Sequence, residues 1–170
     1  MKTLCLLRHA KSDWDASYGG DHERPLNERG RQAAKKMGAY LRQEIIQPDI
    51  ILSSTAKRTK ETLALVMKHA GWTSEVTYSA NLYLCSRTDI LRELASLDHG
   101  IESALIVGHQ PTTGDFASWL LGGKEVDVPT GTFMTFSLPI LSWKELKAAH
   151  VAHAAQAALK LYVTPKQLDN

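Results

Sequence analysis

Short apolar runs that end in polar residues recur along the chain and predict buried β-strands. Such a run fits a strand whose two faces are both covered by other elements of the fold. Near position 135 two sets of side chains alternate, which is also typical of a strand. The strands predicted in this way cover residues 2–7, 49–52, 76–78, 103–107, 132–138 and 159–163.

Between the strands, apolar residues recur at helical spacing, and capping or helix-breaking residues mark the ends of these stretches. Asn27 is predicted to cap a helix that runs to about Glu44 and that Pro48 stops. Gly71 is expected to end the next helix, because glycine readily adopts the left-handed conformation of a helix end. The later helices are predicted at residues 56–69, 88–97 and 111–121, with two glycines at 122–123 after the last.

Strands that alternate with helices predict an α/β fold, a three-layer sandwich in which helices flank a mostly parallel central sheet. With 170 residues of ordinary composition, the chain is expected to form one domain, residues 1–170. Residues 11–24 are polar and rich in turn formers, so they predict a long loop of the kind that is often functional. The alanine-rich part of the tail after Trp143 is compatible with one more helix.

The charge and the amino terminus narrow the class of protein. A net charge of +2 disfavours a general binder of nucleic acid or of membrane surfaces, so neither partner is expected and any positive field must be local. The first apolar run is interrupted by Arg8, and it is too short for a signal peptide or a membrane span.

The cysteines and histidines give no indication of a metal or a cofactor. Cys5 and Cys85 form no CxxC pair and are expected to be buried thiols, which favours a reducing compartment, the cytoplasm. His150 and His153 lie three residues apart, but no third ligand accompanies them, so they are expected at the surface. No metal and no cofactor are predicted.

Polar residues that packing does not explain follow three of the predicted strands. Arg8 and His9 follow the first strand, Arg58 follows the second, and His109 follows the strand at 103–107. Because ligands of open α/β sheets bind beyond the carboxyl ends of the strands, these side chains are expected to meet at one edge.

Two arginines and two histidines at one edge predict a site for a phosphoryl group with a nucleophile in it. The planar forks of arginine match pairs of phosphoryl oxygens. A neutral imidazole can attack phosphorus and form a phosphohistidine, which divides one difficult displacement into two easier ones. Nearby arginines disfavour a second positive charge on that imidazole, so they help to keep His9 neutral.

These residues resemble the signature of the histidine phosphatase superfamily, which has the phosphoglycerate-mutase-like fold. The short length and the Arg-Pro-Leu element are most similar to the SixA-type phosphohistidine phosphatases. The matching elements are Leu7-Arg8-His9-Ala10, Arg24-Pro25-Leu26 with Gly30, Ser53-Ser54 with Arg58 and Glu61-Thr62, Val107-Gly108-His109, and the ending Tyr162-Val163-Thr164-Pro165.

The resemblance implies a role for each matching residue. His9 takes the place of the nucleophile, and Arg8 and Arg58 take the places of the arginines that bind the phosphoryl group. His109 matches the histidine that stabilises the transferring oxygens, and Arg24 matches an arginine that lies against the bound anion. The implied substrate is a phosphorylated protein, a phosphorelay or carrier protein, or else a small phosphorylated molecule.

Two positions depart from the family pattern. Ala10 replaces the glycine of the signature, and Asn81 stands where mutases and many acid phosphatases carry an acid. An alkoxide leaving group needs a proton, whereas the imidazole of a phosphohistidine already carries one on its ring. The loss of the acid therefore favours hydrolysis of phosphohistidine over that of esters, with Asp13 and Asp15 as alternative acids.

Other functions and roles remain open at this point. A cysteine-dependent phosphatase needs an arginine six positions after its cysteine, and Cys5 and Cys85 both lack it. A mutase would need the missing acid, and a phosphate-binding module without activity would have no need of His9. A general small-molecule phosphomonoesterase stays the main alternative. Ser12 and Ser53 could each donate a hydroxyl to phosphate or form a turn.

Overall fold

The computed structural model of the chain describes residues 1–148 and 156–169. His150, His153 and most of the alanine-rich stretch lie outside the described residues. The short helix α5 (Lys144–Ala148) immediately precedes that stretch. No helix of the described part has both the length and the apolar character that a membrane span requires.

All of the predicted strands are present, and they form one mixed sheet of six strands. The sheet has the order β3-β2-β4-β1-β5-β6. The first four of these are parallel to one another, whereas β5 runs antiparallel to β1 and β6 runs antiparallel to β5. The strands are β1 (Lys2–Arg8), β2 (Ile50–Ser54), β3 (Glu75–Ser79), β4 (Ser103–Gly108), β5 (Phe133–Leu138) and β6 (Ala158–Val163).

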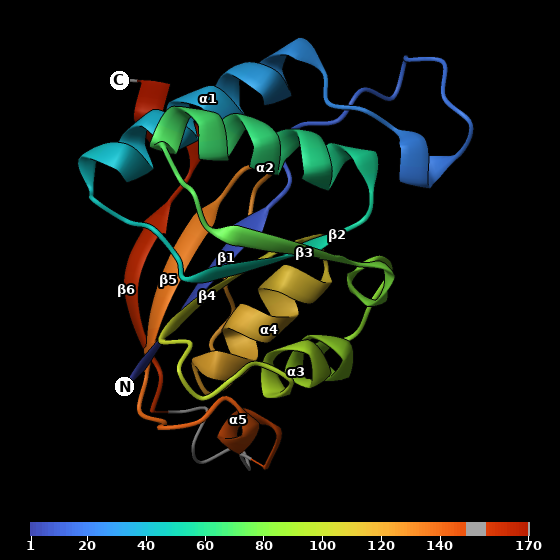
Figure 1. Cartoon of the computed structure of the whole chain (residues 1–170). Helices are drawn as coiled ribbons and strands as arrows, with labels where there is room; N and C mark the ends of the chain where they lie inside the picture. Colours follow the sequence, from blue (N-terminus) through green and yellow to red (C-terminus); the bar gives the residue numbers. More distant parts are fainter. Residues whose placement is uncertain (149–155, 170) are drawn as a thin grey trace.

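Helices cover both faces of the sheet and complete the predicted three layers. In Figure 1, α1 and α2 lie above the sheet, and α3 and α4 lie below it, with α5 beneath them. The helices are α1 (Glu28–Gln43), α2 (Lys57–Ala70), α3 (Arg87–Ala95) and α4 (Thr112–Leu120). The described residues also form short 3-10 turns, η1 (Asp21–Glu23) and η2 (Ala80–Leu82) in connections and η3 (Pro165–Asp169) after β6.

The predicted helix ends are observed, including that of α1 near Glu44, but the residue expected to stop α1 does not do so. The Asn27 side chain caps α1 by accepting a hydrogen bond from the backbone N–H of Gly30 at 2.8 Å. Gly71 ends α2 in the left-handed conformation, with φ +71°. Pro48, however, does not stop α1: the helix ends at Gln43, and the chain turns away through Ile45, which has φ +55°.

Each face of the sheet has its own apolar core, as the pattern of β1 illustrates. Leu4 and Leu6 point into the cluster between the sheet and the helices α3 and α4, whereas Cys5 and Leu7 point into the cluster between the sheet and the helices α1 and α2. All four side chains are at most 2% exposed. Because side chains alternate along a strand, a central strand with two covered faces must be apolar at every position.

The connections that follow β1 and β4 leave the sheet on opposite faces. The chain goes from β1 to α1 on one face, and from β4 to α4 on the other (Figure 1). These two strands are neighbours, and Arg8 at the end of β1 pairs with Gly108 at the end of β4. Such a reversal opens a crevice beyond the carboxyl ends of two adjacent strands. His9 and His109 are the next residues along each chain segment.

Candidate active site

The structure brings together the residues that were predicted to form the site. Arg8, His9, Arg58 and His109 line one cavity of about 580 Å³ at the carboxyl ends of β1, β2 and β4. Arg24 lines the same cavity, although it comes from the long loop between β1 and α1. The rings of His9 and His109 lie 5.3 Å apart between centroids.

Hydrogen bonds to three neighbouring segments hold the backbone around His9. Its N–H donates to the carbonyl of Gly108 at 3.1 Å, and its carbonyl accepts from the N–H of Gly131 at 2.9 Å. The N–H of Ala10 donates to Oγ1 of Thr62 at 2.9 Å. With only 6% of the residue exposed, His9 is fixed by both the sheet and α2.

The hydrogen bond of the His9 ring indicates which of its nitrogens is free. Nδ1 lies 2.7 Å from the carbonyl oxygen of Ala10, which can only accept, so Nδ1 carries the proton. Nε2 is then left with a free lone pair. Burial, together with the charges of Arg58 and Arg8, lowers the pKa of His9 to about 4. The ring is therefore neutral near pH 7.

The ring of His109 is held through Nε2, whereas that of His9 is held through Nδ1. Its Nε2 lies 2.8 Å from Oγ of Ser54, and that hydroxyl oxygen accepts from the N–H of Ala56 at 3.2 Å. The hydroxyl proton of Ser54 is then free to donate to Nε2, which places the ring proton on Nδ1. Burial and the neighbouring His9 and Arg58 lower the pKa of His109 to about 3. His109 is thus a neutral donor through Nδ1.

Four buried side-chain nitrogens have no hydrogen-bond partner among the described residues, and all four belong to this site. They are Nε of Arg8, Arg24 and Arg58 and Nδ1 of His109. Buried polar groups are almost always paired, so unpaired donors of this kind need an explanation. Three guanidinium groups and a neutral imidazole offer donors that suit the oxygens of an anion.

Arg24, whose place in the site was implied only by resemblance, is buried in the cavity wall. Its guanidinium donates to Oγ of Ser12 and, at 2.9 Å, to Oδ1 of Asp21. The ring of Trp14 covers it, with Cζ 3.6 Å from the ring centroid. Ser12 therefore holds an arginine of the site, so its hydroxyl does not serve the turn alone.

Asp21 is a residue of the site that sequence reasoning missed. Its carboxylate accepts from the hydroxyl of Tyr83 at 2.7 Å and from Arg24 and Arg58 at 2.9 and 3.0 Å. These contacts, led by the Tyr83 hydroxyl, hold the pKa of Asp21 well below its usual range. Asp21 is therefore ionised near neutral pH and orients two arginines. Its spacing of three residues before Arg24 was the available signal.

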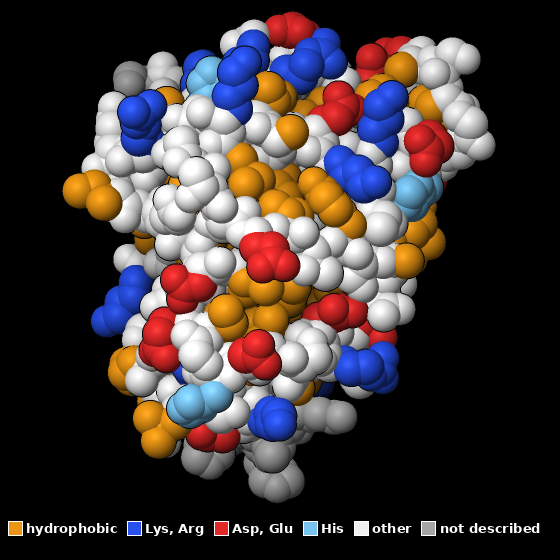
Figure 2. Space-filling model, viewed as in Figure 1, with side chains coloured by type: hydrophobic (Ala, Val, Ile, Leu, Met, Phe, Trp, Pro, Cys, Tyr) orange, Lys and Arg blue, Asp and Glu red, His pale blue; other side chains and the backbone are white. Residues whose placement is uncertain are grey.

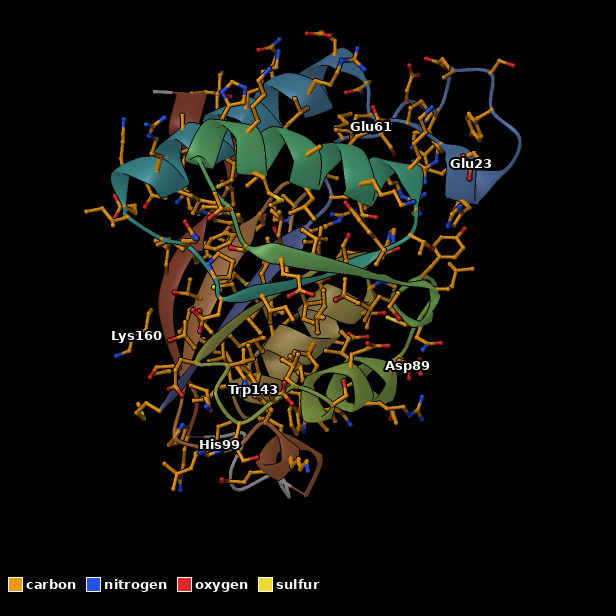
Figure 3. All side chains as sticks on the ribbon, in the orientation of Figure 1. Glu23, Glu61, Asp89, His99, Trp143 and Lys160 are labelled. Atoms are coloured by element: carbon orange, nitrogen blue, oxygen red, sulfur yellow. The ribbon has the colours of Figure 1, made fainter. Side chains whose placement is uncertain are left out.

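Two residues of the family pattern tie the loop and the nucleophile to α2. Oε1 of Glu61 accepts from the N–H of Leu26 at 3.2 Å, directly after Arg24 and Pro25. Figure 3 shows Glu61 on α2 beside this loop, whose 3-10 turn carries Glu23. Thr62, the next residue, accepts from Ala10 and donates to the carbonyl of Arg58 at 2.7 Å.

Several other sequence candidates lie apart from the cavity. The Ser53 hydroxyl donates to the carbonyl of Ser54 at 3.0 Å, which fits the structural role. Oδ1 of Asp13 accepts from the N–H groups of Asp15 and Ala16, so this carboxylate stabilises a turn. Asn81 is exposed, and its amide donates to Glu93 at 3.2 Å. Within the described residues, Asp13, Asp15 and Asn81 do not line the cavity.

His22, on the same loop as Asp21, is partly exposed beside the site. Its ring packs against Tyr83 at 4.8 Å between centroids, and its Nε2 lies 2.8 Å from Oγ1 of Thr55. No local pattern in residues 11–24 predicts that the loop folds back in this way. In the described part of the chain, no group of three or more His, Cys, Asp and Glu side chains is placed to hold a metal ion.

Comparisons with known proteins agree with this geometry. A model of the histidine phosphatase superfamily (branch 1) matches residues 4–83. An uncharacterized protein of Mycobacterium tuberculosis is 35% identical over 84% of this chain and 87% of its own length. The structure assigned to phosphohistidine phosphatase SixA of Nakamurella multipartitia has a TM-score of 0.80 to this one at 30% identity, and the match covers 96% of both chains.

A second solved structure extends the likeness of the fold. The protein histidine phosphatase SixA in complex with tungstate has a TM-score of 0.79 to this chain at 20% identity, over 98% of this chain and 99% of its own. The likeness extends over the whole sheet and both helical layers, beyond the part that the family model matches.

Proposed function

The chain belongs to the histidine phosphatase superfamily, and on this basis we propose that it removes phosphoryl groups from phosphohistidine residues of proteins, with His9 as the nucleophile. The observation that carries the proposal is the His9 ring, neutral and held through Nδ1, within a cavity lined by three arginines. The phosphatases with solved structures described above, of the SixA type, support the choice of substrate.

The reaction proceeds in two displacements at phosphorus. In the first, Nε2 of His9 bonds to phosphorus while the P–N bond to the substrate imidazole breaks. The departing imidazole keeps the electron pair and the proton that its other nitrogen already carries. In the second, a water oxygen bonds to phosphorus, the P–Nε2 bond breaks, and the water proton passes to phosphate or solvent. His9 returns to its neutral form with the proton still on Nδ1.

The surrounding donors act on the charge of the transferring phosphoryl group. Arg8 and Arg58 approach its equatorial oxygens from β1 and α2, and Arg24 approaches from the loop. His109 donates through Nδ1, since its Nε2 faces Ser54. Fixed donors of this kind stabilise the transition state without having to reorganise during the reaction.

The absence of an acid at Asn81 supports phosphohistidine as the substrate. Asn81 cannot donate a proton as an acid, and Asp21 is ionised and bound to Arg24 and Arg58. An alkyl ester would leave as an alkoxide that needs a proton, whereas a protonated phosphohistidine would not. The same reasoning applies to the phosphorylated form of His9, because Nδ1 keeps its proton throughout.

A small-molecule phosphomonoesterase is the second candidate. The cavity of about 580 Å³ falls within the range that small-molecule sites occupy, roughly 300–1,000 Å³. A cysteine-dependent mechanism is not supported, because burial raises the pKa of Cys5 to about 12 and also raises the pKa of Cys85, the half-buried cysteine that lines the cavity, which favours the protonated form of both thiols. Neither cysteine is in a disulfide, which supports placing the protein in the cytoplasm.

A direct comparison of substrates tests the proposal. We expect kcat/KM on a phosphohistidine-containing protein to exceed that on an alkyl phosphate such as glycerol phosphate by at least about 10³-fold. Equal turnover of the two would favour the phosphomonoesterase. Binding of phosphohistidine without any turnover would favour a recognition module. Inorganic phosphate measured by a coupled assay provides the readout for both substrates.

A further inference from the structure

Two large apolar side chains stand exposed at the mouth of the cavity. Trp14, on the loop after β1, is 71% exposed, and Leu84, after η2, is 81% exposed. Both line the cavity, although they lie 70 positions apart in the sequence. Leu84 has φ +51°, a conformation that a leucine rarely adopts. Single exposed apolar residues are common, but two at the mouth of one site mark a surface for contact.

A basic hollow adjoins the cavity on the side of α1. It has a volume of about 600 Å³ and shares Lys11 and Thr130 with the cavity wall. Four cations and two carboxylates line it, and both carboxylates are already paired, Asp169 with Lys36 and Glu28 with Arg31. The other three cations, Lys11, Arg29 and Lys166, form no ion pair within residues 1–148 and 156–169. In Figure 2, many Lys and Arg side chains of the visible face lie over α1 and α2, with Asp and Glu side chains among them.

A third depression continues the surface on the opposite side of the mouth. It has a volume of about 640 Å³ and shares Cys85, Pro111 and Thr112 with the cavity. Hollows therefore flank the cavity on two sides and extend well beyond the phosphoryl-binding residues. A small ligand would fill the central cavity alone, whereas a segment of protein would cover the mouth and both hollows.

We propose that this face docks an acidic protein segment in which apolar residues flank the phosphohistidine. Leu84 and Trp14 contact the apolar neighbours, and Lys11, Arg29 and Lys166 attract the acidic residues. The inference rests on the proposed function and names the kind of protein that the site accepts. Opposite charges across a docking surface chiefly speed association and select the partner, and salt weakens them.

Two synthetic peptides with a central phosphohistidine test the docking surface. One carries Leu and Glu around the phosphohistidine, and the other carries Ser and Lys at the same positions. The protein should hydrolyse the Leu/Glu peptide with a kcat/KM at least about tenfold higher at low salt. The preference should shrink at about 0.5 M salt.

Charge reversal on the basic hollow supplies the decisive variants. Arg29→Glu with Lys166→Glu should raise KM for the Leu/Glu peptide about fivefold or more and should leave turnover of phosphoramidate within about twofold. The control is Lys144→Glu with Lys160→Glu, which makes the same charge change at exposed residues on α5 and β6. Figure 3 shows Lys160 at the edge of the sheet. The control should behave as the unaltered protein does.

A variant and a matched control test the apolar part of the docking surface. Leu84→Gly should lower the ratio of kcat/KM for the Leu/Glu peptide to that for phosphoramidate by about threefold or more. Ile45→Gly is the control, because Ile45 is also exposed and also has a positive φ, at +55°. Equal activity on both peptides, or an equal effect of the two charge reversals, would overturn the docking surface. Failure to hydrolyse either peptide while esters are hydrolysed would instead overturn the proposed function.

Discussion

Nε2 of His109 lies 2.8 Å from Oγ of Ser54, across the boundary between two neighbouring strands. Ser54 is the last residue of β2, and His109 follows the last residue of β4, which pairs with β2. Ser54 is fully buried, its oxygen accepts a backbone hydrogen bond, and Nε2 of His109 is the acceptor that the structure offers to its hydroxyl proton. This contact determines which nitrogen of His109 carries the proton.

Without the Ser54 hydroxyl, the ring proton of His109 should no longer be confined to Nδ1. We expect Ser54→Ala to lower kcat roughly 10- to 100-fold, by analogy with the loss seen when the partner that orients a metal-binding histidine is removed. Ser54→Thr keeps a hydroxyl and should recover most of the activity. The ¹⁵N chemical shifts of His109 should indicate protonation at Nδ1 in the unaltered protein and a mixture of tautomers in Ser54→Ala. Unchanged ¹⁵N shifts would contradict the assignment.

The two depressed histidine pKa values predict how stability changes with pH. Folding lowers the pKa of His9 to about 4 and that of His109 to about 3, from an ordinary value of 6.5. As the pH falls below about 6.5, the unfolded chain binds protons at these positions and the folded protein does not. The free energy of unfolding must therefore decrease as the pH falls through this window.

A variant that cannot titrate separates this contribution from others. In His109→Gln, the decline in unfolding free energy between about pH 7 and pH 4.5 should be smaller by roughly 2 kcal/mol. Urea denaturation at several pH values gives the measurement. An identical decline in the variant and the unaltered protein would show that His109 is not held neutral by the fold.

The arginines are expected to act through the geometry of their forks as well as through their charge. Arg58→Lys keeps the charge but cannot reproduce two parallel hydrogen bonds to phosphoryl oxygens. We expect kcat to fall on the order of 10²-fold, with a smaller change in KM. Arg92→Lys is the control, because Arg92 is exposed on α3, where it pairs with Asp89. Full activity in Arg58→Lys would remove Arg58 from the site.

The lack of an acid at Asn81 predicts how ester substrates behave. When log kcat is plotted against the pKa of the leaving group, aryl and alkyl phosphates should fall on a steep line, because no group protonates the departing oxygen. A flat plot would reveal an acid, and Asp13 and Asp15 would be its first candidates. In that case Asp13→Asn or Asp15→Asn should make the plot steeper.

The strands, the main helices and four of the site residues could be predicted because their signals are local. A buried strand needs a continuous apolar run, as residues 2–7 show, and the polar residues that follow must lie at the strand end. The apolar runs do not encode the direction of each strand within the sheet. The antiparallel course of β5 and β6 therefore emerged only from the structure.

The parts of the site that were missed depend on the path of a loop or on the pleat of a strand. Asp21 and His22 reach the site only because residues 11–24 fold back onto α2 and Tyr83. Ser53 and Ser54 are adjacent, and side chains on a strand alternate between faces, so one serine faces His109 and the other does not. The sequence does not show which of the two serines faces His109, because both positions are buried.

The central claim is that the phosphoryl group passes through Nε2 of His9. Rapid quenching with base after mixing with ³²P-labelled phosphohistidine protein should trap a phosphoenzyme that is stable to base and labile to acid. Peptide mapping should place the label on His9, and ³¹P NMR should place it on Nε2. His9→Ala should form no phosphoenzyme and lose essentially all turnover. Undiminished turnover in His9→Ala, or a label on another residue, would contradict the mechanism.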